Sequence, residues 1–184
     1  MANINIFELV IIGTSLAMDA VAVCICKGLS IKKITKKNIL FTASCFAIFQ
    51  AVMPVIGYVF GNTFEKYIIS INHWVAFLIL LIIGINMLRN INNNSLNDNI
   101  DFITLLPLAI ATSIDALAVG ITLAFLDSNI LISSLIIGIV TFILTSLGVV
   151  IGNKFGNKYE KKAQIFGALI LIVLSFKILL EHLI

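Results

Sequence analysis

Two aspartates, Asp19 and Asp115, stand within strongly apolar stretches of the chain, and each belongs to the same short pattern. Asp19 lies in MDAVAV at 18–23, and Asp115 lies in IDALAV at 114–119. If these stretches cross a bilayer, each ionised carboxylate costs about 2.5–3.5 kcal/mol even on the lenient insertion scale. Acids kept at such a cost bind ions or carry protons, and two carboxylates match the charge of one divalent cation. The pair therefore indicates a cation site or a proton-coupling device.

The composition indicates which class of protein holds these aspartates. Of 184 residues, 60% are hydrophobic and only 11% are charged, and the mean hydropathy is +1.14. Soluble domains are usually about 45–50% apolar. We therefore interpret the chain as an all-α, polytopic membrane protein.

Six apolar stretches are each close to the roughly 20 residues that a helix needs to cross a bilayer. Asn72 and His73 interrupt the front of the third stretch, where the strictly apolar run starts only at Trp74. The predicted transmembrane helices are 4–26, 39–60, 68–88, 103–126, 130–151 and 163–183.

Positive charge is concentrated in the first, third and fifth connections between these helices. Ten of the twelve Lys and Arg residues lie there, so the positive-inside rule places these connections in the cytoplasm and both termini outside. The lysines flank the spans directly, which favours attraction to lipid headgroups over nucleic-acid binding. The ten residues are Lys27, Lys32, Lys33, Lys36, Lys37, Arg89, Lys154, Lys158, Lys161 and Lys162.

A second pair of matching segments indicates an internal duplication. GYVFGN at 57–62 matches GVVIGN at 148–153, in the same order along each half as the aspartate patterns. Each half holds three predicted spans, an odd number, so the second half must have the opposite orientation in the membrane. We predict a single membrane domain, 1–184, with repeat 1 at 1–90, a cytoplasmic linker at 91–101 and repeat 2 at 102–184. Inverted repeats of this kind place a transport site near the midplane between the halves.

Two other interpretations of these segments stay open. Short patterns of small residues can recur by chance, and the Gly57/Gly61 and Gly148/Gly152 pairs also suit simple close packing of helices. For the glycines we favour the packing role.

Further oxygen ligands are expected beside the aspartates. At 100° per residue, Ser15 lies on the helical face of Asp19, while Thr112 and Thr122 lie near the face of Asp115. Pro54 lacks the N–H that would bond the carbonyl of Gln50, which frees that carbonyl beside a polar side chain; an ordinary kink is the equal alternative. Oxygen ligands of this kind suit Mg²⁺, Ca²⁺ or Mn²⁺. The candidate metal-ligating residues are Asp19, Asp115, Gln50, Ser15, Thr112 and Thr122.

The other candidate groups favour structural roles. Lys177 suits a counter-ion or a snorkelling anchor in the last span, and His73 beside Trp74 suits an interfacial anchor. Cys24 and Cys26 are two residues apart and point to different helical faces, so they do not form a zinc-type cluster. A phosphate-binding glycine loop and a nucleophile elbow are both absent from the sequence, which excludes nucleotide-driven transport and predicts that the chain is not an enzyme.

These motifs resemble the manganese efflux pump family, MntP, within the LysE-type exporter superfamily, over nearly the whole chain. The similarity implies a six-span exporter of cytoplasmic Mn²⁺ in which Asp19 and Asp115 are the functional acids. The chain departs from the family pattern at Cys24, Cys26 and Asn86, where Ser, Gly and a basic residue are usual. The matching motifs are SLAMDAVAV, the KG at 27–28, FQAVMPVIG, NHWVAF, TSIDALAVGITLAFL and TFILTSLGVVIGNKFG.

The sequence thus predicts six transmembrane helices, arranged as two inverted three-helix repeats, in the cytoplasmic membrane. We expect a secondary-active transporter that exports divalent cations, first Mn²⁺, as substrates, with no cofactor. The expected partners are Mn²⁺ or a related divalent cation and the lipid bilayer, not nucleic acid, and a homo-oligomer is compatible with the sequence. The alternatives are an exporter of an amino acid or another small cation, and a non-transporting, sporulation-type membrane scaffold.

Overall fold

The computed structural model describes residues 5–29, 31, 34–90, 102–126 and 128–183, and every element in them is a helix. Within α2 and α5, several residues, chiefly 60–76 and 156–164, are described by their backbone alone. The helices are α1 (Ile6–Leu29), α2 (Lys36–Asn90), α3 (Phe102–Thr112), α4 (Ile114–Phe125) and α5 (Ile130–Leu183).

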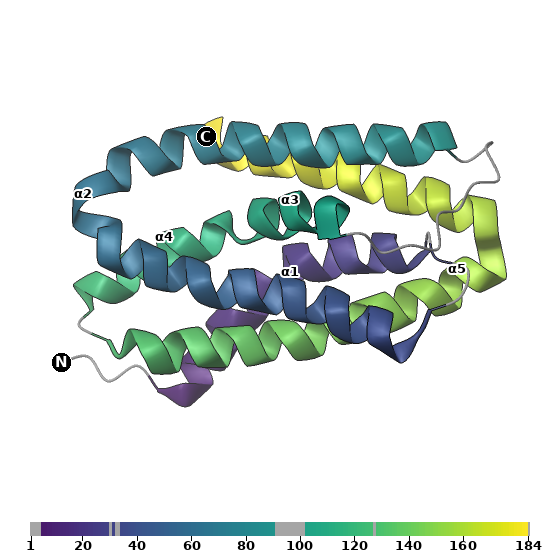
Figure 1. Cartoon of the computed structure of the whole chain (residues 1–184). Helices are drawn as coiled ribbons and strands as arrows, with labels where there is room; N and C mark the ends of the chain where they lie inside the picture. The colour runs from purple at the N-terminus through teal and green to yellow at the C-terminus, as the bar shows by residue number, and fades with distance from the viewer. Residues whose placement is uncertain (1–4, 30, 32–33, 91–101, 127, 184) are drawn as a thin grey trace.

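Two of the helical segments are far too long to cross a bilayer once. The 55 residues of α2 would extend about 80 Å as a straight helix, against a hydrocarbon core of about 30 Å. Figure 1 shows that α2 and α5 each double back, so that the last part of each runs antiparallel to its first part. Each of these segments therefore supplies both arms of a helical hairpin.

The described residues include three helices that are long and apolar enough to span a membrane, Ile6–Leu29, Lys36–Val59 and Ile130–Phe155. A fourth candidate is the pair Phe102–Thr112 and Ile114–Ala124, which is bent by 43°. These four agree with four of the predicted spans. Fourteen of the 21 residues in the predicted span 68–88, and nine of the 21 in the predicted span 163–183, are among those whose side chains are not described. The chain is an all-helical membrane protein.

The stretch predicted as one continuous helix at 103–126 is interrupted at Ser113, between α3 and α4. Pro107 lies inside α3 and has no N–H to donate. The Thr112 hydroxyl donates to the carbonyl of Leu108 at 2.9 Å, and both the N–H and the hydroxyl of Ser113 donate to the carbonyl of Ile110 at 3.1 Å. Bonds of this kind compete with the regular helical ladder and bend helices.

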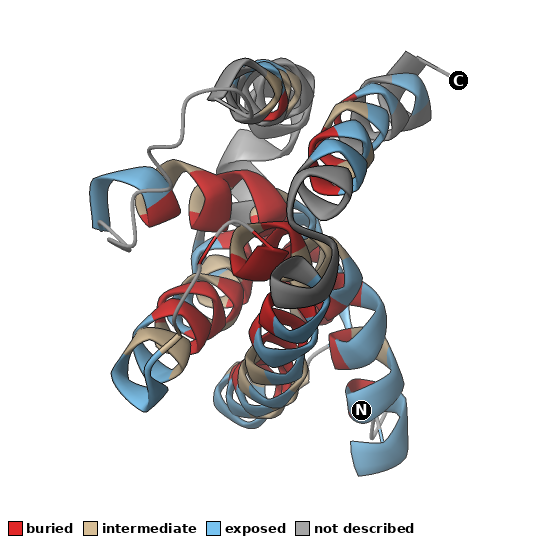
Figure 2. Cartoon of the chain, turned by 90° about the vertical axis from the view of Figure 1, so that its right-hand side faces the viewer, coloured by how far each residue is buried: buried red, intermediate tan, exposed pale blue. Residues whose placement is uncertain are grey.

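Small and apolar side chains fill the interior, and large apolar side chains cover the outside. α1 packs mainly against α5, while α2 packs against α5 and α4. Figure 2 shows buried residues along the inward faces of the helices and exposed residues along the outward faces. The outer surface carries many exposed apolar side chains and therefore suits contact with lipid. Examples are Leu131 and Ile103, which are 72% and 82% exposed.

Glycines allow two pairs of helices to approach closely. A Cβ atom added at Gly57 of α2 would overlap the carbonyl oxygen of Leu117 in α4, and one added at Gly120 of α4 would overlap that of Pro54. In the same way, a Cβ at Gly152 of α5 would overlap the carbonyl oxygen of Ile25 in α1. Backbone contacts of this kind are the usual result of small residues at membrane helix interfaces.

Replacing Gly57 by alanine is expected to destabilise the fold by about 1–3 kcal/mol, because the added methyl group would force α2 and α4 apart. The thermal unfolding midpoint of the detergent-solubilised protein measures this effect. Gly13→Ala is the matched control, since its Cβ would lie 3.3 Å from the nearest described atom, the Cα of Ile137. Equal midpoints for the two variants would contradict the assigned contact.

Candidate ion-binding site

The structure brings Asp19 and Asp115 close enough to interact electrostatically. Asp19 is half-buried on α1, and Asp115 is exposed in the first turn of α4. One carboxylate oxygen of Asp115 accepts a hydrogen bond of 2.8 Å from the N–H of Ala116. Because the two carboxylates repel each other, a cation bound between them would relieve that repulsion.

The interruption at Ser113 determines the surroundings of Asp115. α4 begins at Ile114, and Ser113 makes no side-chain capping bond to the first turn. The N–H groups at the start of a helix lack partners within the helix and carry partial positive charge. An acid in this first turn is therefore stabilised electrostatically, which a continuous helix would not provide.

Gln50 of α2 contacts α1 and lies near Asp115 of α4. Its Nε2 donates to the carbonyl of Leu16 in α1 at 3.1 Å, and its side chain lies near enough to Asp115 to interact with that carboxylate. The side chain is fully buried, yet its Oε1 atom has no hydrogen-bond partner among the described residues. Because Nε2 donates to the Leu16 carbonyl, the amide is held in one orientation and Oε1 remains available to an ion or to water.

The three hydroxyl residues predicted as ligands differ in their surroundings. Ser15 is exposed on α1, one turn before Asp19. Thr112 is buried and Thr122 is exposed, and each donates to a carbonyl of its own helix, Thr122 to Ala118 at 3.2 Å. The structure thus places Gln50 near enough to Asp115 to interact with it, and the ligand roles of Gln50 and of these three hydroxyls stay predictions.

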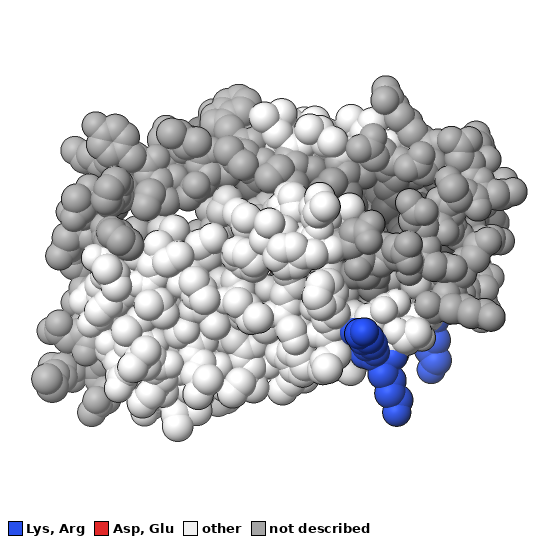
Figure 3. Space-filling model, viewed as in Figure 1, with Lys and Arg blue, Asp and Glu red and all other residues white. Residues whose placement is uncertain are grey.

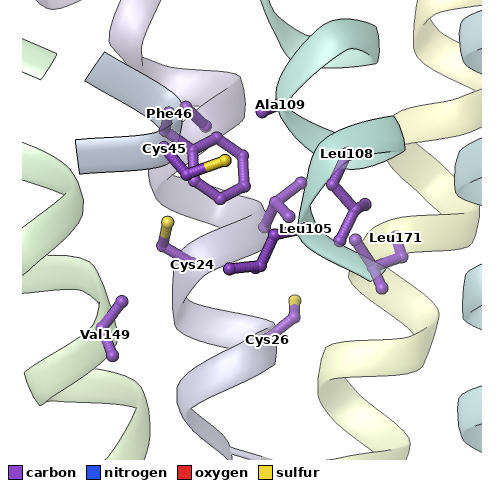
Figure 4. Close-up of a cluster of buried hydrophobic side chains, with 11 residues drawn as sticks. Cys24, Cys26, Cys45, Phe46, Leu105, Leu108, Ala109, Val149 and Leu171 are labelled. Carbon is purple, nitrogen blue, oxygen red and sulfur yellow. The ribbon is translucent and has the colours of Figure 1, made fainter. Parts of the chain in front are cut away.

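The three cysteines are free thiols buried in an apolar cluster (Figure 4). Cys26 donates to the carbonyl of Gly167 in α5 at 3.2 Å. Figure 4 shows Cys24 and Cys26 on different sides of α1, as the sequence predicts. Among the described residues, no group of three or more His, Cys, Asp or Glu side chains could hold a metal ion. A cation at this site would therefore need amide or backbone oxygens besides the two carboxylates.

Sequence reasoning proposed the aspartates and Gln50 as ligands, a role that stays a prediction, and it did not anticipate two features of their surroundings. It did not predict the bond from Gln50 to Leu16, which joins residues 34 positions apart. It also expected a straight helix through Ser113, although the adjacent Thr112 and Ser113 after Pro107 were available as a signal of a bend. Lys177, His73 and Asn86 lie outside the residues whose side chains are described.

Comparison with known proteins assigns the sequence to a family. The family model described as "Putative manganese efflux pump" matches residues 33–179. No solved structure matches the chain.

Relatives that carry the name "Putative manganese efflux pump MntP" cover almost the whole chain. The relative from Acetivibrio thermocellus is 50% identical over 96% of this chain and 91% of its own length. Those from Desulfitobacterium hafniense and Campylobacter jejuni are 47% and 48% identical, over 96% and 97% of this chain and 95% and 98% of their own lengths. The family is one of transport proteins, not of enzymes. The chain therefore belongs to the MntP family of manganese efflux pumps.

Proposed function

We propose that this protein is a secondary-active transporter that exports divalent metal cations, first of all Mn²⁺, from the cytoplasm. The observation that carries this proposal is the cluster of Asp19, Asp115 and Gln50, in which a fully buried amide oxygen has no described partner. The names of the relatives support manganese as the ion.

The chemistry of the cluster suits a hard divalent ion. Mn²⁺ prefers carboxylate, carbonyl and water oxygens, and the two aspartates would balance its charge. The Gln50 oxygen would supply a neutral ligand without adding charge. Ser15, Thr112 and Thr122 are proposed as residues that contact the ion or its water molecules.

A gradient or the membrane potential must drive export, because the sequence has no nucleotide-binding motif. An aspartate that takes up a proton when the ion leaves would couple the two movements. Such exchange requires alternate access to the site from the two sides of the membrane.

An inverted repeat would provide alternate access, and the reciprocal glycine contacts support it. Gly57 packs against Leu117, while Gly148 lies so close to α1 that an added Cβ would be 3.2 Å from the carbonyl oxygen of Val21. The alignment that pairs Asp19 with Asp115 also pairs Val21 with Leu117. The first part of α2 thus packs on α4, and the first part of α5 packs on α1, at positions that the alignment makes equivalent. Such reciprocal packing suits a mechanism in which one repeat rocks against the other.

The proposed architecture follows from this relation. The single domain 1–184 would consist of two three-helix repeats, 1–90 and 102–184, joined by a cytoplasmic linker at 91–101. Figure 3 shows described lysines gathered toward one end of the molecule, the lower right of that view. We assign that end to the cytoplasm and the termini to the outside of the cytoplasmic membrane.

Asp19→Asn and Asp115→Asn are each expected to abolish Mn²⁺ transport. Removal of groups that merely support a metal ligand lowers affinity by roughly 10- to 100-fold, so loss of a charged ligand should cost at least that much. Mn²⁺ uptake by inverted vesicles or efflux from proteoliposomes, with matched amounts of folded protein, measures the effect.

Two results would contradict this assignment. If either variant transports Mn²⁺ at the wild-type rate, that aspartate is not a ligand. If wild type moves no Mn²⁺, Zn²⁺, Cd²⁺ or Co²⁺ and the variants merely reduce the amount of folded protein, the acids join helices and the protein is a scaffold.

Gln50→Leu is expected to lower kcat/KM for Mn²⁺ by about tenfold, because leucine fills the space but removes both the free oxygen and the hydrogen bond to Leu16. Concentration-dependent transport in proteoliposomes gives this value. Met53→Leu, one turn further along α2, is the matched control and should transport like wild type. An unchanged kcat/KM for Gln50→Leu would remove Gln50 from the site.

Single cysteines at exposed ends of the helices test the orientation. Lys37→Cys is expected to react with a membrane-impermeant thiol reagent only in inverted vesicles, and Asn129→Cys only in intact cells. Both positions are exposed, and the three native cysteines are buried. The opposite pattern of labelling would reverse the assigned orientation.

A further inference from the structure

Two buried side-chain atoms lack a hydrogen-bond partner in the described part of the chain, and both belong to α2. One is Oε1 of Gln50, in the site already described, and the other is the hydroxyl oxygen of Thr42. Thr42 is fully buried. Eight residues separate the two, which corresponds to about 12 Å along the helix.

The unpartnered hydroxyl distinguishes Thr42 from the other described buried threonines. The hydroxyls of Thr112, Thr141 and Thr145 each donate to the carbonyl four residues earlier, at 2.9, 2.9 and 2.7 Å. Thr42 is also inside a helix and could do the same with Asn38, yet no such bond is present. Its hydroxyl therefore does not serve the local helix, and a buried polar group without a partner costs free energy.

An apolar cluster separates the lysine-bearing end of the protein from the ion site. We call it the Phe46 cluster, because this fully buried ring lies on α2 between Thr42 and Gln50. Its buried members, most of them labelled in Figure 4, are Ala20, Val23, Cys24, Cys26, Cys45, Phe46, Leu105, Leu108, Ala109, Val149 and Leu171.

On α1 and α2 the cluster lies between a lysine and a residue of the ion site, and on α3 and α5 the order of residues agrees with that placement. On α1 its members follow Asp19 and precede Lys27, and on α2 they follow Lys37 and precede Gln50. On α3 they precede Asp115, and on the first part of α5 Val149 precedes Lys154. Four helices thus contribute apolar side chains to one layer on the lysine side of the site, and an ion cannot pass such a layer without water or polar ligands.

We propose that the Phe46 cluster is the closed gate on the cytoplasmic side of the site, and that the Thr42 hydroxyl contacts the hydrated divalent cation when this gate opens. This inference rests on the proposed export function. The hydroxyl has no partner in the closed state because its partner is the ion's water shell in the open state. Thr42 would then be a transit position between the lysine-rich surface and Gln50.

Thr42→Val tests this role, because it removes the hydroxyl and keeps the shape of the side chain. We expect it to lower the rate of Mn²⁺ transport from the cytoplasmic side by about tenfold, the size of one lost polar contact during passage. Thr42→Ser, which keeps the hydroxyl, should retain most of the rate. Thr145→Val is the matched control, since that buried hydroxyl bonds its own helix. The unfolding midpoint of Thr42→Val should equal or exceed that of wild type.

The outcomes separate this inference from the proposed function. If wild type transports and Thr42→Val transports equally fast, the inference is wrong and the export function stands. The inference is also wrong if Thr42→Val and Thr145→Val slow transport equally, or if the loss of rate only follows a lower unfolding midpoint. A wild-type protein that moves no divalent cation overturns both.

Thiol labelling keeps the inference testable if the valine variant does not fold. Thr42→Cys should react with a membrane-impermeant reagent from the cytoplasmic side of inverted vesicles during transport, and added Mn²⁺ should change the rate of labelling. Wild type, with three buried cysteines, gives the background, and Lys37→Cys is the positive control. Labelling of Thr42→Cys at the background rate under all conditions would overturn the inference.

Discussion

The repulsion between two carboxylates in an apolar setting is the constraint on which the rest of this structure depends. Asp19 and Asp115 lie close enough to interact, yet they come from helices far apart in the sequence. Such an arrangement is stable only where fixed dipoles, hydrogen bonds or a cation offset the charge. The start of α4 supplies a favourable helix dipole, and the Ala116 N–H donates a hydrogen bond to Asp115. The Gln50 amide adds a further polar contact, and a bound ion would supply the positive charge.

The bend between α3 and α4 shows how the fold meets this requirement. In a membrane, a helix interruption is tolerated only where neighbouring groups satisfy the freed backbone atoms or where the backbone lines a cavity. Here the hydroxyls of Thr112 and Ser113 accompany the interruption, and Asp115 stands in the first turn after it. The close glycine contacts of α4 with α2 keep this short helix in place beside Gln50.

The buried polar side chains of the described residues differ in whether their oxygen atoms have hydrogen-bond partners. Most buried hydroxyls bond the carbonyls of their own helix and need no further partner. Gln50 and Thr42 differ, because each keeps a buried oxygen that has no hydrogen-bond partner within the described part of the chain. In a transport protein, such oxygens are expected along the route of the ion, and the apolar layer between them suits a barrier that opens only part of the time.

The sequence by itself determined the class of protein and its acids. Apolar content and segment length require membrane helices, and the repeated pattern around Asp19 and Asp115 marks the two acids, because the cost of burying charge leaves few such residues. The bend at Ser113, the bond from Gln50 to Leu16 and the unpaired Thr42 hydroxyl were decided only by the tertiary structure. Helical periodicity describes one helix at a time, whereas these features depend on which helices pack together and on which hydrogen-bond partners that packing leaves within reach.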